Sequence, residues 1–263
     1  MASGARVDTP SVVASPARGR ARRPAPGARG ALALALAVAA WPAEALIPSA
    51  DGILASAARR REALGVRTLI VEGVLRRPGQ DDLKVRELLL AGAGHRVELG
   101  EGKDQLVILT LGARQWRWRA GERPTQSTLA RPSLVLAFLG DSAAHAAVGR
   151  ELLAAYDVDD DVVALTRLDR QIAFSIGARA WEPDKPQLWI DKSYRTPVRL
   201  VEVDGGGHRV ETRLLGWGAA QTGEWWPQRI ERWVDGQRAE VTVYVELLVN
   251  EPLDAGLFRP PPG

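Results

Sequence analysis

An alternating pattern close to the C-terminal end of the chain restricts the possible folds more than any other feature. From residue 238 to residue 249, every second residue is apolar. One face of this stretch is predicted to carry Ala239, Val241, Val243, Val245, Leu247 and Val249. Because successive side chains of a β-strand point to opposite faces, the pattern predicts a long strand with one covered face and one wet face. Asp235-Gly236, just before it, is typical of a tight hairpin turn.

Shorter segments of the same kind fill most of the chain after residue 65. Strands are predicted at 66–75, 83–91, 96–99, 105–111, 115–119, 162–168, 171–176, 187–191, 198–203, 209–217 and 226–234. Glycine-containing turns separate many of them, and Gly92-Ala93-Gly94 is one example. Short strands joined by such turns are typical of an antiparallel meander that closes fully or partly into a barrel.

Two regions interrupt the strand pattern and favour helices. Residues 51–64 place Ile53, Leu54 and Ala57 on one face. Residues 131–156 contain an apolar segment at 133–139 and a second segment that begins after Asp141, a good N-cap. Helices inserted between strands predict a lid laid across a sheet. The expected fold class is therefore α+β, mainly antiparallel β, in the form of a half-open, incomplete β-barrel with a helical lid.

The N-terminal part has the composition of an export signal. Residues 1–30 are rich in alanine, proline, glycine and arginine, residues 31–40 are an unbroken apolar run, and Ala43-Glu44-Ala45 is a small-residue cleavage pattern. The apolar run is shorter than the roughly 18 residues that a membrane-spanning helix needs; a buried helix is the alternative. We therefore expect a signal peptide with a disordered basic leader at 1–45, and a single domain at 46–263.

Charge and cysteine content exclude several classes of function. The chain has a net charge of +3, but six of its 35 basic residues and two of its 32 acidic residues precede residue 46. The remainder has 29 basic and 30 acidic residues, so it lacks the basic excess typical of nucleic-acid binding. The absence of cysteine excludes disulfides, a thiol nucleophile, thiolate metal ligands and a lipid-attachment cysteine. An exported form is expected to be soluble.

Several short motifs in the second half carry a family resemblance. They are Ile176-Gly177-Ala178, the LWIDK run at 188–192, the TPVRL run at 196–200 and the segment from Asn250 to Phe258. These motifs resemble the LolA-like family of periplasmic carriers that sort outer-membrane lipoproteins. The resemblance implies an open barrel with helices over its mouth and an apolar cavity beneath them. It also implies an acylated lipoprotein or lipid as ligand, membrane-associated donor and acceptor proteins, a monomeric state, and the periplasm of a Gram-negative-type envelope.

The expected binding site is the apolar cavity under the lid. Its lining, taken from the alternation and the resemblance, comprises Leu134, Leu136, Phe138 and Leu139 of the lid and Trp189, Trp217, Ile230, Val243 and Val245 of the sheet. Nine tryptophans suit such a cavity, and they suit an ordinary barrel core equally well. Arg199 is the candidate for a latch that holds the lid shut. The alternative is a surface arginine paired with Glu202 or Asp191.

Signals for catalysis or metal binding are weak. Gly140-Asp141-Ser142 resembles the serine block of GDSL-type hydrolases, but the Asp141–His145 and Asp204–His208 spacings are one residue longer than that family's DxxH. A helix N-cap explains Asp141 and Ser142 without catalysis. The histidines, His95 included, lack the spacing of zinc ligands, and the acidic run at 157–161 lacks the glycine and distal glutamate of a calcium loop. No cofactor or metal is expected.

These features favour a non-enzymatic carrier that shields acyl chains in its barrel, with a chaperone role in outer-membrane lipoprotein sorting. Two other hypotheses stay open. A regulatory or scaffold module of the same fold would sense a lipid or protein ligand without ferrying it. A hydrolase centred on Ser142 would show esterase activity that Ser142→Ala abolishes.

Overall fold

The computed structural model describes residues 47–128, 131–136, 142–179 and 181–261, and the side chains of 142–148 are not among them. Residues from Ile47 onward form one compact unit. The predicted signal peptide and leader lie outside the described residues.

The N-terminal half of the described chain contributes one helix and six strands. They are α2 (Ala50–Glu62), β1 (Thr68–Arg76), β2 (Leu83–Leu90), β3 (Gly94–Leu99), β4 (Leu106–Leu111), β5 (Arg114–Arg119) and β6 (Thr125–Thr128), with a short 3₁₀ helix, η1 (Gly102–Asp104), before β4. The sequence analysis missed β6, because its four polar residues are all exposed and carry no alternation.

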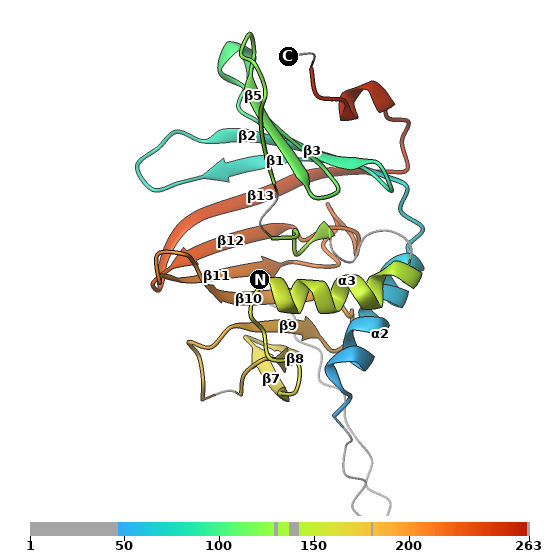
Figure 1. Cartoon of the computed structure of the whole chain (residues 1–263), viewed down its shortest axis with the longest axis vertical. Helices are drawn as coiled ribbons and strands as arrows, with labels where there is room; N and C mark the ends of the chain where they lie inside the picture. Colours follow the sequence, from blue (N-terminus) through green and yellow to red (C-terminus); the bar gives the residue numbers. More distant parts are fainter. Residues whose placement is uncertain (1–46, 129–130, 137–141, 180, 262–263) are drawn as a thin grey trace, which may run out of the picture. The chain divides into compact units, whose positions relative to one another are not determined.

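The C-terminal half contributes a helix and the strands that Figure 1 labels from β7 to β13. They are α3 (Ser142–Ala155), β7 (Val163–Leu168), β8 (Gln171–Ile176), β9 (Gln187–Asp191), β10 (Pro197–Val203), β11 (Arg209–Leu215), β12 (Arg229–Val234) and β13 (Gln237–Val249), followed by the 3₁₀ helix η3 (Ala255–Phe258).

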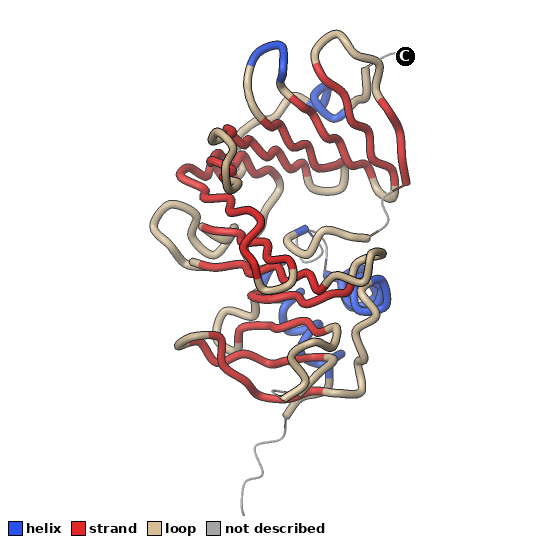
Figure 2. The backbone as a smooth tube through the Cα atoms, turned by 90° about the vertical axis from the view of Figure 1, so that its left-hand side faces the viewer, coloured by secondary structure: helices blue, strands red, loops and turns tan. Residues whose placement is uncertain are grey.

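All thirteen strands form one antiparallel sheet that does not close. Its order is β6-β5-β4-β3-β2-β1-β13-β12-β11-β10-β9-β8-β7, so each half is a simple meander and the β1–β13 pair joins the two. Among the described strands, β6 and β7 each have one neighbour only. Figure 2 shows the strands as a curved sheet with the helices to one side. The expected fold class, an incomplete antiparallel barrel with helices, is confirmed.

The helices cover one face of the sheet, which we call the inner face. The side chain of Ser49 caps α2 by accepting a hydrogen bond from the backbone N–H of Gly52, and the apolar face of α2 turns inward with Ile53 and Leu54 buried. At Gly149 of α3 an added Cβ would lie 3.2 Å from the side chain of Leu54. The glycine therefore lets the two helices approach closely. The helix predicted at 51–64 is confirmed.

The lid differs from the prediction in its first segment. In the described part of the expected 133–139 helix, residues 134 and 135 form a turn and residue 136 has 3₁₀ geometry, so the predicted α-helix is not found there. The turn packs both Leu134 and Val135 into the main core. The second lid helix is confirmed as α3.

The long strand β13 contains a bulge that reverses its predicted alternation. Glu72 of β1 pairs with Glu246, but the next residue, Gly73, pairs with Tyr244, so Val245 has no partner on β1. Tyr244 is therefore on the inner face and 2% exposed, whereas Val245 is 61% exposed. The predicted inward side is right for Leu247 and Val249, which pack against the core, and wrong for Val241, Val243 and Val245.

Two separate apolar cores stabilise the sheet. The larger lies between the inner face and the two helices. The smaller lies on the outer face of β1–β5, where Phe258 of η3 packs with Leu88 and Leu109, flanked by Trp116 and Trp118. The C-terminal segment thus covers an apolar area on the outer face of β1–β5, opposite to the face that α2 and α3 cover.

Candidate functional site

The segment 131–136 is tied to the sheet by an arginine. A guanidinium nitrogen of Arg131 donates to the carboxylate of Glu202, which extends from β10 on the inner face. The same guanidinium lies over the ring of Tyr156, 5.2 Å from its centroid. Arg131 therefore joins the segment both to the sheet and to the residue that follows α3.

Tyr156 adds a second attachment. Its Oη donates a 2.9 Å hydrogen bond to the carbonyl of Pro132. Burial and, to a smaller extent, the charge of Glu202 raise the pKa of Tyr156 to about 12, against a smaller opposing effect of the charge of Arg131. The phenol is consequently a hydrogen-bond donor at neutral pH, and the first two residues of the segment are held on two sides.

A pocket of about 550 Å³ opens beside this segment. It lies between the 131–136 segment, α3 and the turns that join β2 to β3 and β4 to β5. Its lining is mainly apolar or small: Leu89, Leu90, Ala91, Gly92, Ala93, Gly94, His95, Thr110, Gly112, Pro132, Ser133, Leu136 and Glu151. Such a volume and lining are within the range of sites for small apolar ligands. We call it the lid pocket.

Three largely buried polar side chains meet at the wall of the lid pocket, to which His95 belongs. Nε2 of His95 lies 2.9 Å from Oε2 of Glu87, and Oη of Tyr244 donates to Oε1 of the same carboxylate. The side chains of His95 and Glu87 are only 13% and 12% exposed. Burial, followed by the charge of Glu87, raises the pKa of Tyr244 well above its ordinary value, so the phenol remains a donor. Glu87 is thus satisfied on both carboxylate oxygens.

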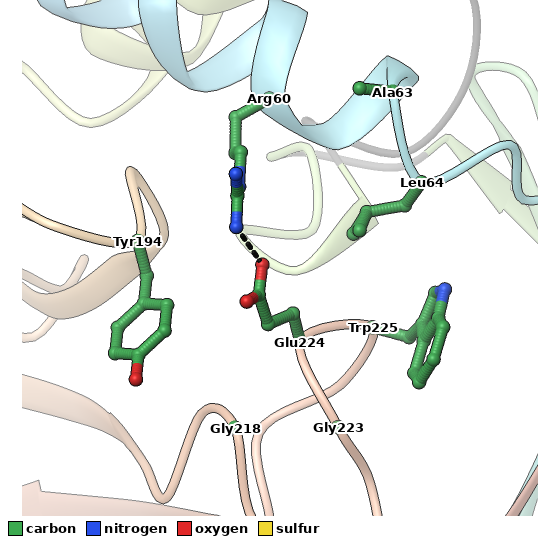
Figure 3. Close-up of a pocket in the computed structure, with 8 residues that line it drawn as sticks. All are labelled: Arg60, Ala63, Leu64, Tyr194, Gly218, Gly223, Glu224 and Trp225. Carbon is green, nitrogen blue, oxygen red and sulfur yellow. Dashed lines mark hydrogen bonds and ion pairs between the residues drawn. The ribbon is translucent and has the colours of Figure 1, made fainter.

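A second pocket, of about 500 Å³, lies at the C-terminal end of α2 (Figure 3). Tyr194 and Trp225 stand on opposite sides of it, and a 2.5 Å ion pair between Arg60 and Glu224 crosses the space between them. The neighbouring Arg61 is buried and donates to the carbonyls of Glu224 and Trp225.

Arg61 joins α2 to the loop 216–227 at this second pocket. Its guanidinium lies 5.0 Å from the centroid of the Trp217 ring. Desolvation by burial lowers the pKa of Arg61 to about 10, and the charge of Glu224 opposes that fall, so the side chain stays charged at neutral pH. The loop 216–227 is fastened to α2 through this arginine.

The structure places the predicted cavity residues on both faces of the sheet. Four are on the inner side, where they belong to the core or pack against it: Leu134, Leu136, Trp217 and Ile230. Three strand residues point to the outer face: Val243, Val245 and Trp189, of which Trp189 is nevertheless 7% exposed and counted in the main core. Phe138 and Leu139 lie outside the described residues. The cause for Val243 and Val245 is the β13 bulge; Trp189 alternates with Leu188 and Ile190, which take the inward positions.

Arg199 does not have the contacts expected of a latch. It makes a bidentate ion pair with Glu211, at 2.9 and 3.0 Å, and its guanidinium lies 4.4 Å from the centroid of the Trp189 ring. Both neighbours are on the outer face, and the ion-pair partner is Glu211 in place of the expected Glu202 or Asp191. Glu202 instead binds Arg131, which is the arginine that joins the lid segment to the sheet.

The group formed by Glu87, His95 and Tyr244 is not predicted from the sequence. One signal was available: residues 83, 85, 87 and 89 of β2 alternate as Leu, Val, Glu and Leu, so a carboxylate interrupts an otherwise apolar face. The other two members come from strands that pair only in the folded sheet, and Tyr244 was assigned to the wrong face.

The described residues do not form the arrangement that the hydrolase or metal-site hypotheses require. Ser142 is the first residue of α3. His208 pairs with Asp235 at 2.7 Å on exposed hairpin ends. In the acidic run, Asp159 Oδ1 accepts from the backbone N–H of Asp161, as in a solvated turn. Within the described ranges no three His, Asp or Glu side chains are grouped as metal ligands.

Solved structures with the same architecture define the class of this fold. A LolA superfamily protein from Nitrosomonas europaea superposes with a TM-score of 0.50 at 16% identity, covering 81% of this chain and 98% of its own. A domain from Vibrio parahaemolyticus, described as an outer membrane lipoprotein-sorting protein, superposes with a TM-score of 0.50 at 12% identity, covering 79% and 97%.

The chain therefore has the fold of the open antiparallel barrels that carry helices on their inner face. More specifically, the fold is LolA-like, and the resemblance found in the sequence motifs is confirmed at the level of fold. No protein-family profile matches the sequence, and neither does any curated protein. Among the described helices, none combines the length and apolarity needed to cross a membrane.

Proposed function

We propose that this protein is an exported carrier in the periplasm that binds the acyl chains of a lipid or lipoprotein between the inner face of its sheet and the lid formed by 131–136 and α3. The lid pocket carries this proposal, because it is an apolar space of about 550 Å³ bordered by the lid of a LolA-like fold. The two solved proteins named above lend support through their fold alone.

Transfer would work by shielding. An acyl chain exposed to water costs about 0.8 kcal/mol for each methylene, so several methylenes make free diffusion between membranes very unfavourable. A pocket lined by Leu89 and Leu136 offsets that cost. The expected partners are membrane-associated donor and acceptor proteins, and the expected state is a monomer.

Accommodating a long chain requires the lid to move. Leu134 of the lid and Trp217 of the loop after β11 are each 6% exposed and belong to the packed core. The attachments at Arg131 and Tyr156 then set how easily the 131–136 segment lifts and extends the pocket inward. This is the basis for a direct test of the lid.

A regulatory or scaffold module of the same fold is the second candidate. The filled inner face favours it, because Leu134 and Trp217, which were predicted to line a cavity, belong to the packed core in this conformation. Such a module would form a stable protein complex and release no lipid on extraction.

Native mass spectrometry separates the two candidates. The mature protein would be purified without detergent from the periplasm of its host, and bound material extracted with organic solvent. A co-purifying lipid or acylated protein is expected for the carrier. A clean apo monomer that also takes up no fluorescent fatty acid would contradict the carrier and favour the module.

Arg131→Ala tests the lid. The Arg131–Glu202 pair is partly buried, so its loss is expected to lower the free-energy cost of lifting the 131–136 segment by about 1 kcal/mol. The rate of fluorescent fatty acid uptake, measured by stopped-flow fluorescence, is then expected to rise about fivefold. Arg76→Ala removes an exposed pair with Asp82 and serves as the matched control, with an unchanged rate. If both variants bind at the wild-type rate, the 131–136 segment does not gate the pocket.

A further inference from the structure

The buried group of Glu87, His95 and Tyr244 suggests which ligand the lid pocket takes. We propose that the pocket binds a single-chain amphiphile with an acidic head group, namely a long-chain fatty acid, whose carboxylate is held by His95 and Thr110. This inference rests on the proposed function, because it concerns the same pocket, and it adds the chemistry of the head group.

The first observation is a carboxylate in an apolar position. On the inner face of β2, Glu87 stands between Val85 and Leu89, which belong to the main core. A charge buried in such surroundings is costly unless it is paired, and a packed apolar side chain would stabilise the fold as well or better. Stability of the fold therefore does not explain why a glutamate is at position 87. A role in holding His95 explains it.

The second observation is the orientation of His95. Its ring lines the lid pocket while Nε2 is held by Glu87, whose other oxygen is held by Tyr244. Tyr244 is fixed in turn by an edge-to-face contact with Trp226, with ring centroids 5.9 Å apart. No described residue hydrogen-bonds Nδ1 of His95, so Nδ1 is the ring nitrogen left for a ligand.

The third observation is a hydroxyl next to the imidazole. Thr110 of β4 is directly opposite His95 of β3, so both side chains are on the inner face, and both line the lid pocket. Thr110 Oγ1 accepts a 3.4 Å hydrogen bond from Gln115, which leaves its own O–H free to donate. Two donors on adjacent strands match the two oxygens of a carboxylate.

The charges agree with an acidic ligand. With Nε2–H directed at Glu87, Nδ1 is the ring nitrogen that can share a hydrogen with the carboxyl group of the ligand, and hydrogen bonds to charged groups are strong. Glu151 also lines the pocket, but it is exposed and water screens its charge. Leu89 and Leu136 then offer apolar surface to the chain.

The experiment compares head groups on one chain length. Titration of the full-length mature protein with hexadecanoic acid and with its methyl ester, followed by displacement of a fluorescent fatty acid, measures the preference for the carboxylate. We expect the acid to bind about tenfold more tightly than the ester. Butyrate, which has the head group without the chain, is expected not to compete.

Variants assign the preference to the proposed residues. His95→Gln is expected to bring the acid to the affinity of the ester while leaving the ester unchanged, and Thr110→Val to reduce the preference about threefold. His208→Gln alters an exposed histidine that pairs with Asp235, and it serves as the control with the preference intact.

The outcomes separate the two proposals. Equal affinity for acid and ester in the wild-type protein overturns the head-group inference and leaves the carrier standing. A preference that survives in a folded His95→Gln variant also overturns it. If neither compound binds, both the carrier and the inference fail. Competition by butyrate as strong as that of hexadecanoic acid would identify a site for small anions instead of an acyl site.

Discussion

At the scale of single residues, the outer face of β9–β12 depends on one carboxylate. Glu211 is 3% exposed and accepts hydrogen bonds from Arg199, Arg209 and Arg213 at distances from 2.5 to 3.0 Å. Burial by itself would raise the pKa of Glu211, but the hydrogen bonds and charges of these arginines lower it to about 2. The arginines in turn lie over Trp189 and Trp233. Ionised Glu211 therefore holds the outer side of four strands together.

This arrangement predicts a specific dependence of stability on pH. Because the pKa of Glu211 is lower in the folded state than in the unfolded state, its stabilisation is complete above about pH 4.5 and is lost as pH falls toward 2. Glu211→Gln is expected to cost about 2–3 kcal/mol at neutral pH and almost nothing near pH 2. Urea unfolding across this range measures the difference.

Glu101→Gln provides the control for that series. Glu101 pairs with Lys84, and both side chains are about two-thirds exposed. No change in stability is expected, since exposed ion pairs contribute little. A Glu211→Gln variant with the same loss of stability at pH 2 as at pH 7 would show that the arginines act by packing and not by charge.

At the scale of elements, the β1–β13 pair decides which side chains face the helices. These two strands are about 170 positions apart in sequence and join the two meanders. The bulge at Val245 turns Tyr244 inward, and Gly73 leaves the room that the tyrosine needs. A Cβ at residue 73 would lie 2.4 Å from the carbonyl oxygen of Val243 and 3.0 Å from the ring of Tyr244. The bulge in β13 and the glycine in β1 therefore depend on each other.

Gly73→Ala is therefore expected to be strongly destabilising. The added methyl group meets backbone as well as a buried ring, so the strands must separate or Tyr244 must leave the inner face, at a cost of about 2–3 kcal/mol. Chemical denaturation measures this loss. Gly205→Ala is the control, because nothing lies within 4 Å of its Cβ, and its stability is expected to match the wild type. Equal stability of the two variants would mean that the pairing register at Gly73 is wrong.

At the scale of the whole described chain, one sheet carries a core on each of its faces. The helices cover the inner face, and η3 covers the outer face of β1–β5. The backbone of the C-terminal segment is pinned beside the first strand, where Oδ1 of Asn250 accepts from the N–H groups of Arg67 and Thr68. The last residues of the chain therefore stabilise its first meander.

Phe258→Ala tests this long-range role. Phe258 is 5% exposed against Leu88 and Leu109, so its truncation is expected to cost about 3–4 kcal/mol and to shift tryptophan fluorescence to the red as Trp116 and Trp118 meet water. Thermal unfolding and emission spectra measure the two effects. Leu248→Ala, at a position that is 41% exposed, is the control and should leave both unchanged. An unshifted spectrum in Phe258→Ala would contradict the outer core.

Local patterns were enough to predict most elements and the class of fold. The alternations predicted twelve of the thirteen strands, and the amphipathic segment at 51–64 predicted α2, because side-chain periodicity is a property of the segment itself. The candidate site was predicted less well. Leu134, Leu136, Trp217 and Ile230 are on the inner side, where they belong to the core or pack against it, whereas Trp189 alternates with two residues that are more deeply buried.

The sequence by itself determined that the chain forms a run of antiparallel strands with helices laid on them, since turn glycines and a period of two act within a few residues. The tertiary structure alone decided which side chains meet at the lid pocket. Glu87, His95 and Tyr244 come from three strands, and the inward position of Tyr244 depends on a bulge opposite Gly73. A bulge shifts every later residue to the other face. Its position depends on pairing with a strand that is distant in sequence, and a local sequence pattern holds no information about that pairing.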